Sequence, residues 1–200
     1  FYIQYNQIPG DMNNAHDYWD SDCLGTESEC NGDGNGFICC HDTEGVYAWH
    51  HMALADITER KYSGDSTDDF YLNVPESELK NSFYKLHRAG SANGNWEIGT
   101  NDIYEKNGNF LGLGYDGGYK DYAYGVMSGE VAESIDNKMD DGNASAGSLV
   151  AIAGATASST FQSGCVDDQN FDTLAKGETD YDLGDSTKSC RLIFWLDRIN

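Results

Sequence analysis

Six cysteines are the feature that most limits how this chain can fold. They stand at Cys23, Cys30, Cys39, Cys40, Cys165 and Cys190. No two of them form a CxxC pair, so zinc-ribbon and thioredoxin-like folds have no support. An even number of cysteines in a chain rich in glycine and asparagine indicates disulfide bonds, and therefore an oxidising compartment. We expect an exported, loop-rich domain that is stapled by disulfides.

The pairing of the cysteines is only partly predictable. Sequence alone does not choose among the many complete pairings that six cysteines permit. Cys165 and Cys190 are the only cysteines of the C-terminal half, and we predict that they bond to each other. The adjacent Cys39 and Cys40 are then predicted to bond to Cys23 and Cys30, in either order.

Composition narrows the class of protein. The chain has 200 residues, 39% of them hydrophobic and 12% aromatic, which suffices for one domain with a core. It carries 34 acidic residues against 12 lysines and arginines, a net charge of -22, with no basic cluster. Such a surface repels phosphate backbones, so we expect no direct nucleic-acid binding.

The sequence contains neither a membrane-spanning run of about 18 apolar residues nor a signal peptide. Phe1 opens a polar and aromatic stretch instead. Because the cysteines predict export, we expect that a leader segment has been removed from the N-terminus.

Apolar periodicity predicts two helices. Residues 43–61 repeat apolar side chains at helical spacing, namely Val46, Trp49, Ala53 and Ile57. Thr43 is the expected N-cap of this helix, and Gly64 lies beyond its end. Residues 129–139 are the second predicted helix, with Ser128 as N-cap. Its apolar face is expected to consist of Val131, Ile135 and Met139.

Short β-prone runs predict strands over residues 109–115, 119–127, 148–153 and 191–196. No internal repeat or charged linker divides the chain, so we expect a single domain over residues 1–200. Within it, residues 1–63 contain a helix end, a calcium-like loop and a helix. Residues 64–129 form a variable insertion rich in glycine and tyrosine. Residues 130–200 contain the C-terminal helix, strands and a disulfide loop.

The segment after Cys30 has the ligand spacing of a calcium loop. Oxygen-bearing residues alternate around Gly36, at the sharp turn of such a loop, and the predicted ligands are Asn31, Asp33, Asn35, the Phe37 carbonyl and Asp42. With only two charged ligands, we expect a weak extracellular-type site, with a Kd on the order of 10⁻⁴–10⁻³ M. The alternative is a Gly/Asn turn that binds nothing.

Other chemistry-bearing residues have simpler structural explanations. The paired acids are usually solvated or cap helices when they lie in turns, and they are Asp68-Asp69, Asp140-Asp141 and Asp167-Asp168. No nucleophile, base and orienting group stand out together, so we predict that the protein is not an enzyme. His50 and His51 are neighbours on a helix and face different directions, so they cannot chelate one metal.

Several motifs follow one another along the chain in the order that is typical of one protein family. The stretch FYIQYNQIPGDMNNAHDYW is similar to the segment after the hydrophobic helix of Gram-negative type IV pilin-like proteins, with Tyr5, Pro9, Gly10, Asp11, Ala15 and Trp19 in place. NGDGNGFI and AWHHMALADI follow in the family's order. ESIDNKMDDGNASAGSLVA resembles its helix-to-turn motif through Ile135, Asp136, Lys138, Asp140, Asp141, Gly142 and Gly147. A late cysteine pair and the apolar CRLIFWL end the series.

This resemblance covers residues 1–63 and 130–200. It implies an α+β fold, a pilin-like head with an antiparallel sheet packed on helices. It also implies a structural subunit of a type IV pilus-like or secretion pseudopilus filament, on the surface of a Gram-negative bacterium. The partners would be other copies or related pilin subunits, and the inner membrane through a preceding hydrophobic helix. Phe1 heads no such apolar helix, so it is not equated with a mature pilin N-terminus.

A rival interpretation is a secreted calcium-dependent carbohydrate-binding module. It uses the same loop and an aromatic platform that would consist of Trp96, Tyr115, Tyr119, Tyr122 and Tyr124. Tyrosine is also common in strands, where it packs without binding a ligand. A third interpretation, a secreted glycosidase, rests only on the abundance of carboxylates.

Overall fold

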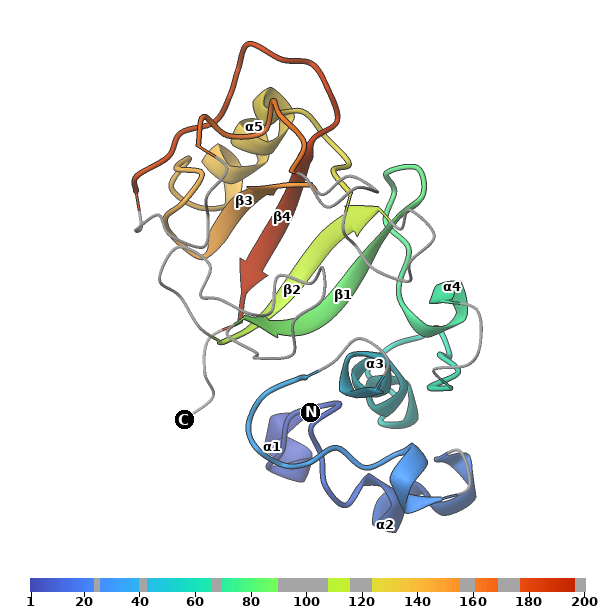
Figure 1. Ribbon diagram of the computed structural model, residues 1–200. Coiled ribbons are helices and arrows are strands. Elements are labelled where there is room, and N and C mark those ends of the chain that lie inside the picture. The colour runs from blue at the N-terminus through green and yellow to red at the C-terminus, as the bar shows by residue number, and fades with distance from the viewer. Residues whose placement is uncertain are drawn as a thin grey trace. The chain divides into compact units, whose positions relative to one another are not determined.

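The computed structural model describes residues 1–23, 26–39, 43–65, 70–89, 108–115, 124–154, 161–168 and 177–196. Contacts divide the chain into two compact units, Phe1–Pro75 and Glu76–Asn200. The boundary falls inside the segment 64–129 that the sequence assigns to an insertion. Figure 1 shows the helices and strands of each unit. The single-domain organisation stays a prediction.

The second unit is built on a four-stranded antiparallel sheet. Its strands are β1 (Ser82–Ala89), β2 (Gly108–Tyr115), β3 (Leu149–Ala153) and β4 (Cys190–Trp195). The strand order is β1-β2-β4-β3, so the last strand of the chain lies between β2 and β3 (Figure 1). Helices and an antiparallel sheet confirm the predicted α+β class.

Alternating side chains of this sheet form two apolar clusters. Leu192 in β4 lies opposite Leu113 of β2 and Ala151 of β3, and all three belong to the larger cluster. The neighbouring Ile193 belongs to the second cluster together with Val150. Successive side chains of a strand point to opposite faces. The sheet therefore carries one apolar cluster on each of its faces.

Helix α5 (Gly129–Met139) begins and ends where the sequence predicts, and it contacts β3 and β4 (Figure 1). The face that it buries matches the predicted one only at Ile135, which is partly buried against the larger cluster. Gly129, Ala132 and Asp136 are buried, whereas Val131 and Met139 are exposed. Small residues let the helix backbone approach the sheet, so the larger apolar side chains lie to the side or outside.

The first unit is helical. It contains α1 (Tyr2–Tyr5), α2 (Ala15–Trp19), two short 3₁₀ turns (Asp20–Asp22 and Glu27–Glu29), α3 (Gly45–Leu54) and α4 (Phe70–Asn73). Its core includes Met12 and Ala15, both completely buried, with the rings of Tyr5 and Trp19 packed against them.

Helix α3 is shorter than the predicted helix over residues 43–61. It begins at Gly45, after Glu44 rather than Thr43 as N-cap, and it ends at Leu54. Asp56 adopts a left-handed backbone with φ of 56°, which an α-helix does not accommodate. Ile57 lies beyond this turn and is exposed, so it does not extend the buried face.

The predicted strands over residues 109–115, 148–153 and 191–196 are confirmed to within one residue at each end. Of the predicted strand 119–127, residues 119–123 lie outside the described residues. Tyr124 and Met127 form only isolated bridges, to Tyr115 and Cys190. Strand β1 was not predicted.

Two disulfides are present in the described residues. Cys165 bonds to Cys190, as predicted. Cys23 bonds to Cys30, which shows that their predicted bonds to Cys39 and Cys40 are wrong. The 3₁₀ turn Glu27–Glu29 lies between Cys23 and Cys30, whose Cα atoms are 5.4 Å apart, so each of them bonds to its nearest cysteine in sequence. Cys39 is disulfide-bonded too, and Cys40 lies outside the described residues.

Disulfides fit the expected oxidising compartment. The helices of the described ranges are all too short or too polar to span a bilayer.

Candidate functional site

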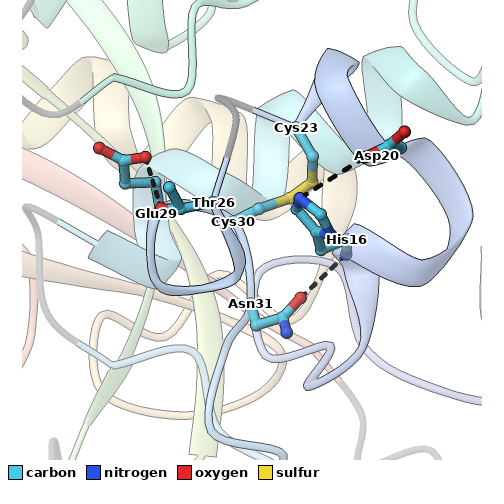
Figure 2. Close-up of polar contacts among 7 residues, drawn as sticks. All are labelled: His16, Asp20, Cys23, Thr26, Glu29, Cys30 and Asn31. Carbon is cyan, nitrogen blue, oxygen red and sulfur yellow. Dashed lines mark hydrogen bonds and ion pairs between the residues drawn. A yellow bond between two sulfur atoms is a disulfide. The ribbon is translucent and has the colours of Figure 1, made fainter.

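The predicted calcium ligands do not all converge. Asn31 is used elsewhere, because its side-chain Oδ1 accepts a hydrogen bond of 2.9 Å from the backbone N–H of His16 (Figure 2). This N–H belongs to the first turn of α2, where backbone donors have no partner inside the helix. Figure 2 also shows the Cys23–Cys30 disulfide that precedes the loop. Asn31 therefore ties the loop to α2.

Asp33 and Asn35 form a local turn. The Asp33 Oδ1 accepts the Asn35 N–H at 3.0 Å, and its Oδ2 accepts the Asn35 side-chain amide at 2.6 Å. The Asn35 Oδ1 in turn accepts the N–H of Phe37 at 2.9 Å. These contacts are typical of asparagine- and aspartate-initiated turns, which order a loop with or without an ion.

Asp11, from the Pro9-Gly10-Asp11 turn, contacts the same loop. Its Oδ1 accepts the N–H of Asn35 and its Oδ2 accepts the N–H of Gly36, both at 2.9 Å. The Asp11 side chain is buried, with 4% exposed. One carboxylate thus fixes two consecutive loop residues.

Glu44, directly before α3, fixes the two flanks of the loop. Its Oε1 accepts the Asp33 N–H at 2.9 Å, and its Oε2 accepts the Cys39 N–H at 2.6 Å. Glu44 is also buried, with 5% exposed. The start of α3 and the loop are therefore held as one structure.

The side chains of Asp11, Asp33 and Glu44 bring one oxygen each within 4.8 Å of the others. Burial is the main reason why the pKa of Asp11 is raised to about 6, with the neighbouring Asp33 adding to it. Burial also raises the pKa of Glu44, and repulsion from both aspartates adds to this. Within the described residues of this unit, these three carboxylates form the group that could hold a cation.

Hydrogen bonding to the loop is enough to explain why Asp11 and Glu44 are buried there. Both oxygens of Asp11 and both oxygens of Glu44 accept backbone N–H groups, which favours their ionised forms. The geometry therefore orders the loop without an ion and leaves calcium binding as a prediction. Among the predicted ligands, Asp42 lies outside the described residues.

Sequence reasoning missed Asp11 and Glu44 as members of this site. Asp11 lies more than one loop length before Asp33, and Glu44 lies beyond the twelve-residue window of a calcium loop. The only available signal was the Pro-Gly-Asp turn, since a turn acid followed by a glycine-rich loop can supply acceptors to exposed backbone N–H groups.

His51 lies beside the disulfide but is no metal ligand with it. The sulfurs of Cys23 and Cys30 are bonded to each other, so they offer no thiolate. His51 instead accepts the Gly10 N–H at Nδ1, at 3.0 Å, and its Nε2 lies 2.9 Å from the Cys30 carbonyl. His50 contacts other segments, as expected for adjacent residues of a helix.

The aromatic platform is described only in part. Tyr115 and Tyr124 pack edge to face, with ring centroids 5.9 Å apart. The two rings therefore pack against each other, as tyrosines in strands commonly do without binding a ligand. Trp96, Tyr119 and Tyr122 lie outside the described residues.

No protein family, curated protein or solved structure matches the chain.

Proposed function

We propose that this chain is a structural subunit of an extracellular type IV pilus-like or secretion pseudopilus filament. In this proposal it assembles with copies of itself or related pilin subunits at the surface of a Gram-negative bacterium. One observation carries the proposal: the residues of the pilin-like motifs hold the backbone in place.

The N-terminal motif illustrates this role. Gly10 has φ of 88° and packs so closely on α3 that a Cβ would collide with the Glu44 carbonyl. Ala15 is completely buried, and the rings of Tyr5 and Trp19 lie 5.3 Å apart. Asp11 is bound to the loop by both oxygens. These contacts hold the segments of the first unit together, which supports a structural role for the motif.

The C-terminal motif is also structural in its contacts. Asp140 accepts the backbone N–H groups of Ser148 and Leu149, which joins the end of α5 to the start of β3. Cys165 and Cys190 are buried and tether the central strand β4. A sheet laid on a helix, with a late disulfide, supports the pilin-like head that the motifs imply.

The test uses cells that make the full-length protein. Filaments are sheared from the cells, and the sheared fraction is probed with an antibody against this chain and examined by immunogold electron microscopy. A strain that lacks the gene is the control. We expect labelled filaments and recovery of the protein in the sheared fraction.

Recovery of the protein solely as free monomer in the medium, without labelled filaments, would contradict the proposal. Calcium-dependent retention of that monomer on polysaccharides would then favour the carbohydrate-binding module instead.

A further inference from the structure

The C-terminal end of α5 gathers three carboxylates. Asp136 lies in the last turn of α5, and Asp140 and Asp141 follow the helix directly. One oxygen of each lies within 4.8 Å of the other two. All three belong to the second unit, away in sequence from the loop around Asp33.

Asp136 is the member that points to a ligand. Its side chain is 0% exposed, and its Oδ2 accepts the hydroxyl of Tyr181 at 2.8 Å. Its Oδ1 is buried without a hydrogen-bond partner among the described residues. The backbone N–H of Gly142 interacts with this carboxyl and lowers its pKa, while Oδ1 remains without a hydrogen-bond partner. A buried carboxylate oxygen without a partner is costly unless a cation or donor meets it.

Asp140 and Asp141 are each oriented by hydrogen bonds to one of their carboxylate oxygens. Asp140 uses Oδ2 to accept the N–H groups of Ser148 and Leu149. Asp141 uses Oδ1 to accept the N–H of Asn143 at 3.0 Å. No hydrogen bond of the described residues uses the second oxygen of either. Each carboxylate of the cluster therefore has one oxygen that accepts a hydrogen bond and one for which the described residues show none.

Charge also favours a cation here. The C-terminal end of a helix carries the negative end of the helix dipole, which repels carboxylates and attracts cations. Lys138 is the basic residue of the last turn, and within the described ranges it forms no ion pair with these carboxylates.

We propose that Asp136, Asp140 and Asp141 form a calcium-binding site at the C-terminal end of α5. Oxygens on opposite sides of a calcium ion lie about 5 Å apart, because each bond is roughly 2.3–2.6 Å long, so the observed spacing allows all three to contact one ion. Water completes the coordination. Calcium suits this site better than magnesium, because its coordination tolerates carboxylates of unequal depth.

The test follows calcium titration by residue-resolved NMR of the whole chain, using the amide signals of Gly142 and Gly147. Gly142 faces Asp136, and Gly147 packs against the Asp140 carboxylate, so both report on this site and not on the loop around Asp33. We expect saturable shifts with a Kd on the order of 10⁻⁴–10⁻³ M. Asp141→Asn, an exposed position, should weaken binding by at least about tenfold, because affinity depends on the number of charged ligands.

Glu130→Gln is the matched control, since it removes one exposed negative charge from the first turn of the same helix. It should leave the affinity unchanged. Asp136→Asn should abolish binding. If the Asp136→Asn variant fails to fold, the result for Asp141→Asn decides. The proposal is overturned if the wild type shows no saturable shift up to about 10 mM calcium. It is equally overturned if Asp141→Asn binds within about threefold of wild type, or if Glu130→Gln weakens binding as much as Asp141→Asn.

Discussion

His51 joins two segments that are far apart in the sequence. Its Nδ1 accepts the Gly10 N–H, so the ring proton of the neutral form is on Nε2, which donates to the Cys30 carbonyl. The ring is completely buried. Protonation of Nδ1 would remove the acceptor for Gly10. Burial is the largest cause that lowers the pKa of His51 to about 4.

This arrangement predicts acid sensitivity. The ordinary pKa of 6.5 describes the unfolded chain, and the folded value is about 4. As pH falls from 6.5 to about 4, the unfolded state takes up a proton at His51 and the folded state does not, so stability falls by up to about 3 kcal/mol. Asp11 acts in the opposite direction, because its raised pKa favours the protonated folded state over the same range.

Comparison with a variant separates the two effects. Urea unfolding of wild type and His51→Phe at pH 7 should show wild type more stable by about 2–4 kcal/mol, since the variant leaves Gly10 N–H and the Cys30 carbonyl without this partner. Near the acid end of the range this difference should shrink by about 2–3 kcal/mol. A difference that is independent of pH would show that His51 is not held neutral by these bonds.

Asp11→Asn should destabilise the protein even though it removes a charge of raised pKa. Both carboxylate oxygens accept backbone N–H groups, and an amide would place its own N–H donors against one of them. We expect a loss of about 1–3 kcal/mol in the free energy of unfolding at neutral pH. Asp22→Asn, which changes an exposed side chain of the same unit, should stay within about 0.5 kcal/mol. Greater stability of Asp11→Asn would mean that charge repulsion outweighs these hydrogen bonds.

At the scale of elements, the loop around Asp33 is predicted to bind calcium independently of the site at the end of α5. Calcium that binds only the folded state raises stability, by about 2.7 kcal/mol at a hundredfold excess over Kd. The amide signals of Gly34 and Gly36 should shift with calcium, and Asp33→Ala should abolish the shift. Glu59→Ala, an exposed acid of the same unit, should not. If Asp33→Ala responds as wild type does, the loop is a turn and its predicted ligands are wrong.

Regular patterns made several elements predictable. The period of α5 and the apolar runs of β3 and β4 are local signals, and their bounds are close to the predicted ones. Strand β1 escaped prediction because Lys85 and His87 interrupt its apolar pattern although both are buried. The end of α3 depends on the backbone of Asp56, which periodicity does not reveal.

The candidate sites were less predictable than the elements. The loop pattern identified Asp33 and Asn35, but the acceptors Asp11 and Glu44 reach the loop only through tertiary packing. Similarly, the acids at the end of α5 read as solvated turn residues in the sequence. Burial of Asp136 beneath Tyr181, from a segment 45 residues later, is what distinguishes them.

At the scale of the whole molecule, each unit has its own disulfide. Cys23–Cys30 closes a separation of 7 residues in the first unit, and Cys165–Cys190 closes 25 in the second. In the chain-entropy account, the longer loop constrains the unfolded chain more, about 3.5 kcal/mol against about 2.4 kcal/mol. The longer bond also lies in the main core, at the start of the central strand β4.

This difference predicts an order of destabilisation. Cys165→Ala/Cys190→Ala should lower the free energy of unfolding by about 3–5 kcal/mol, and Cys23→Ala/Cys30→Ala by about 2 kcal/mol. Alanine is the appropriate replacement, because all four cysteines are completely buried and serine would add an unpaired hydroxyl. The measurement is urea unfolding of each double variant against wild type, with peptide mass mapping to verify the remaining bonds. Equal losses, or a larger loss for the Cys23–Cys30 variant, would show that strand tethering by Cys165–Cys190 is not the stronger constraint.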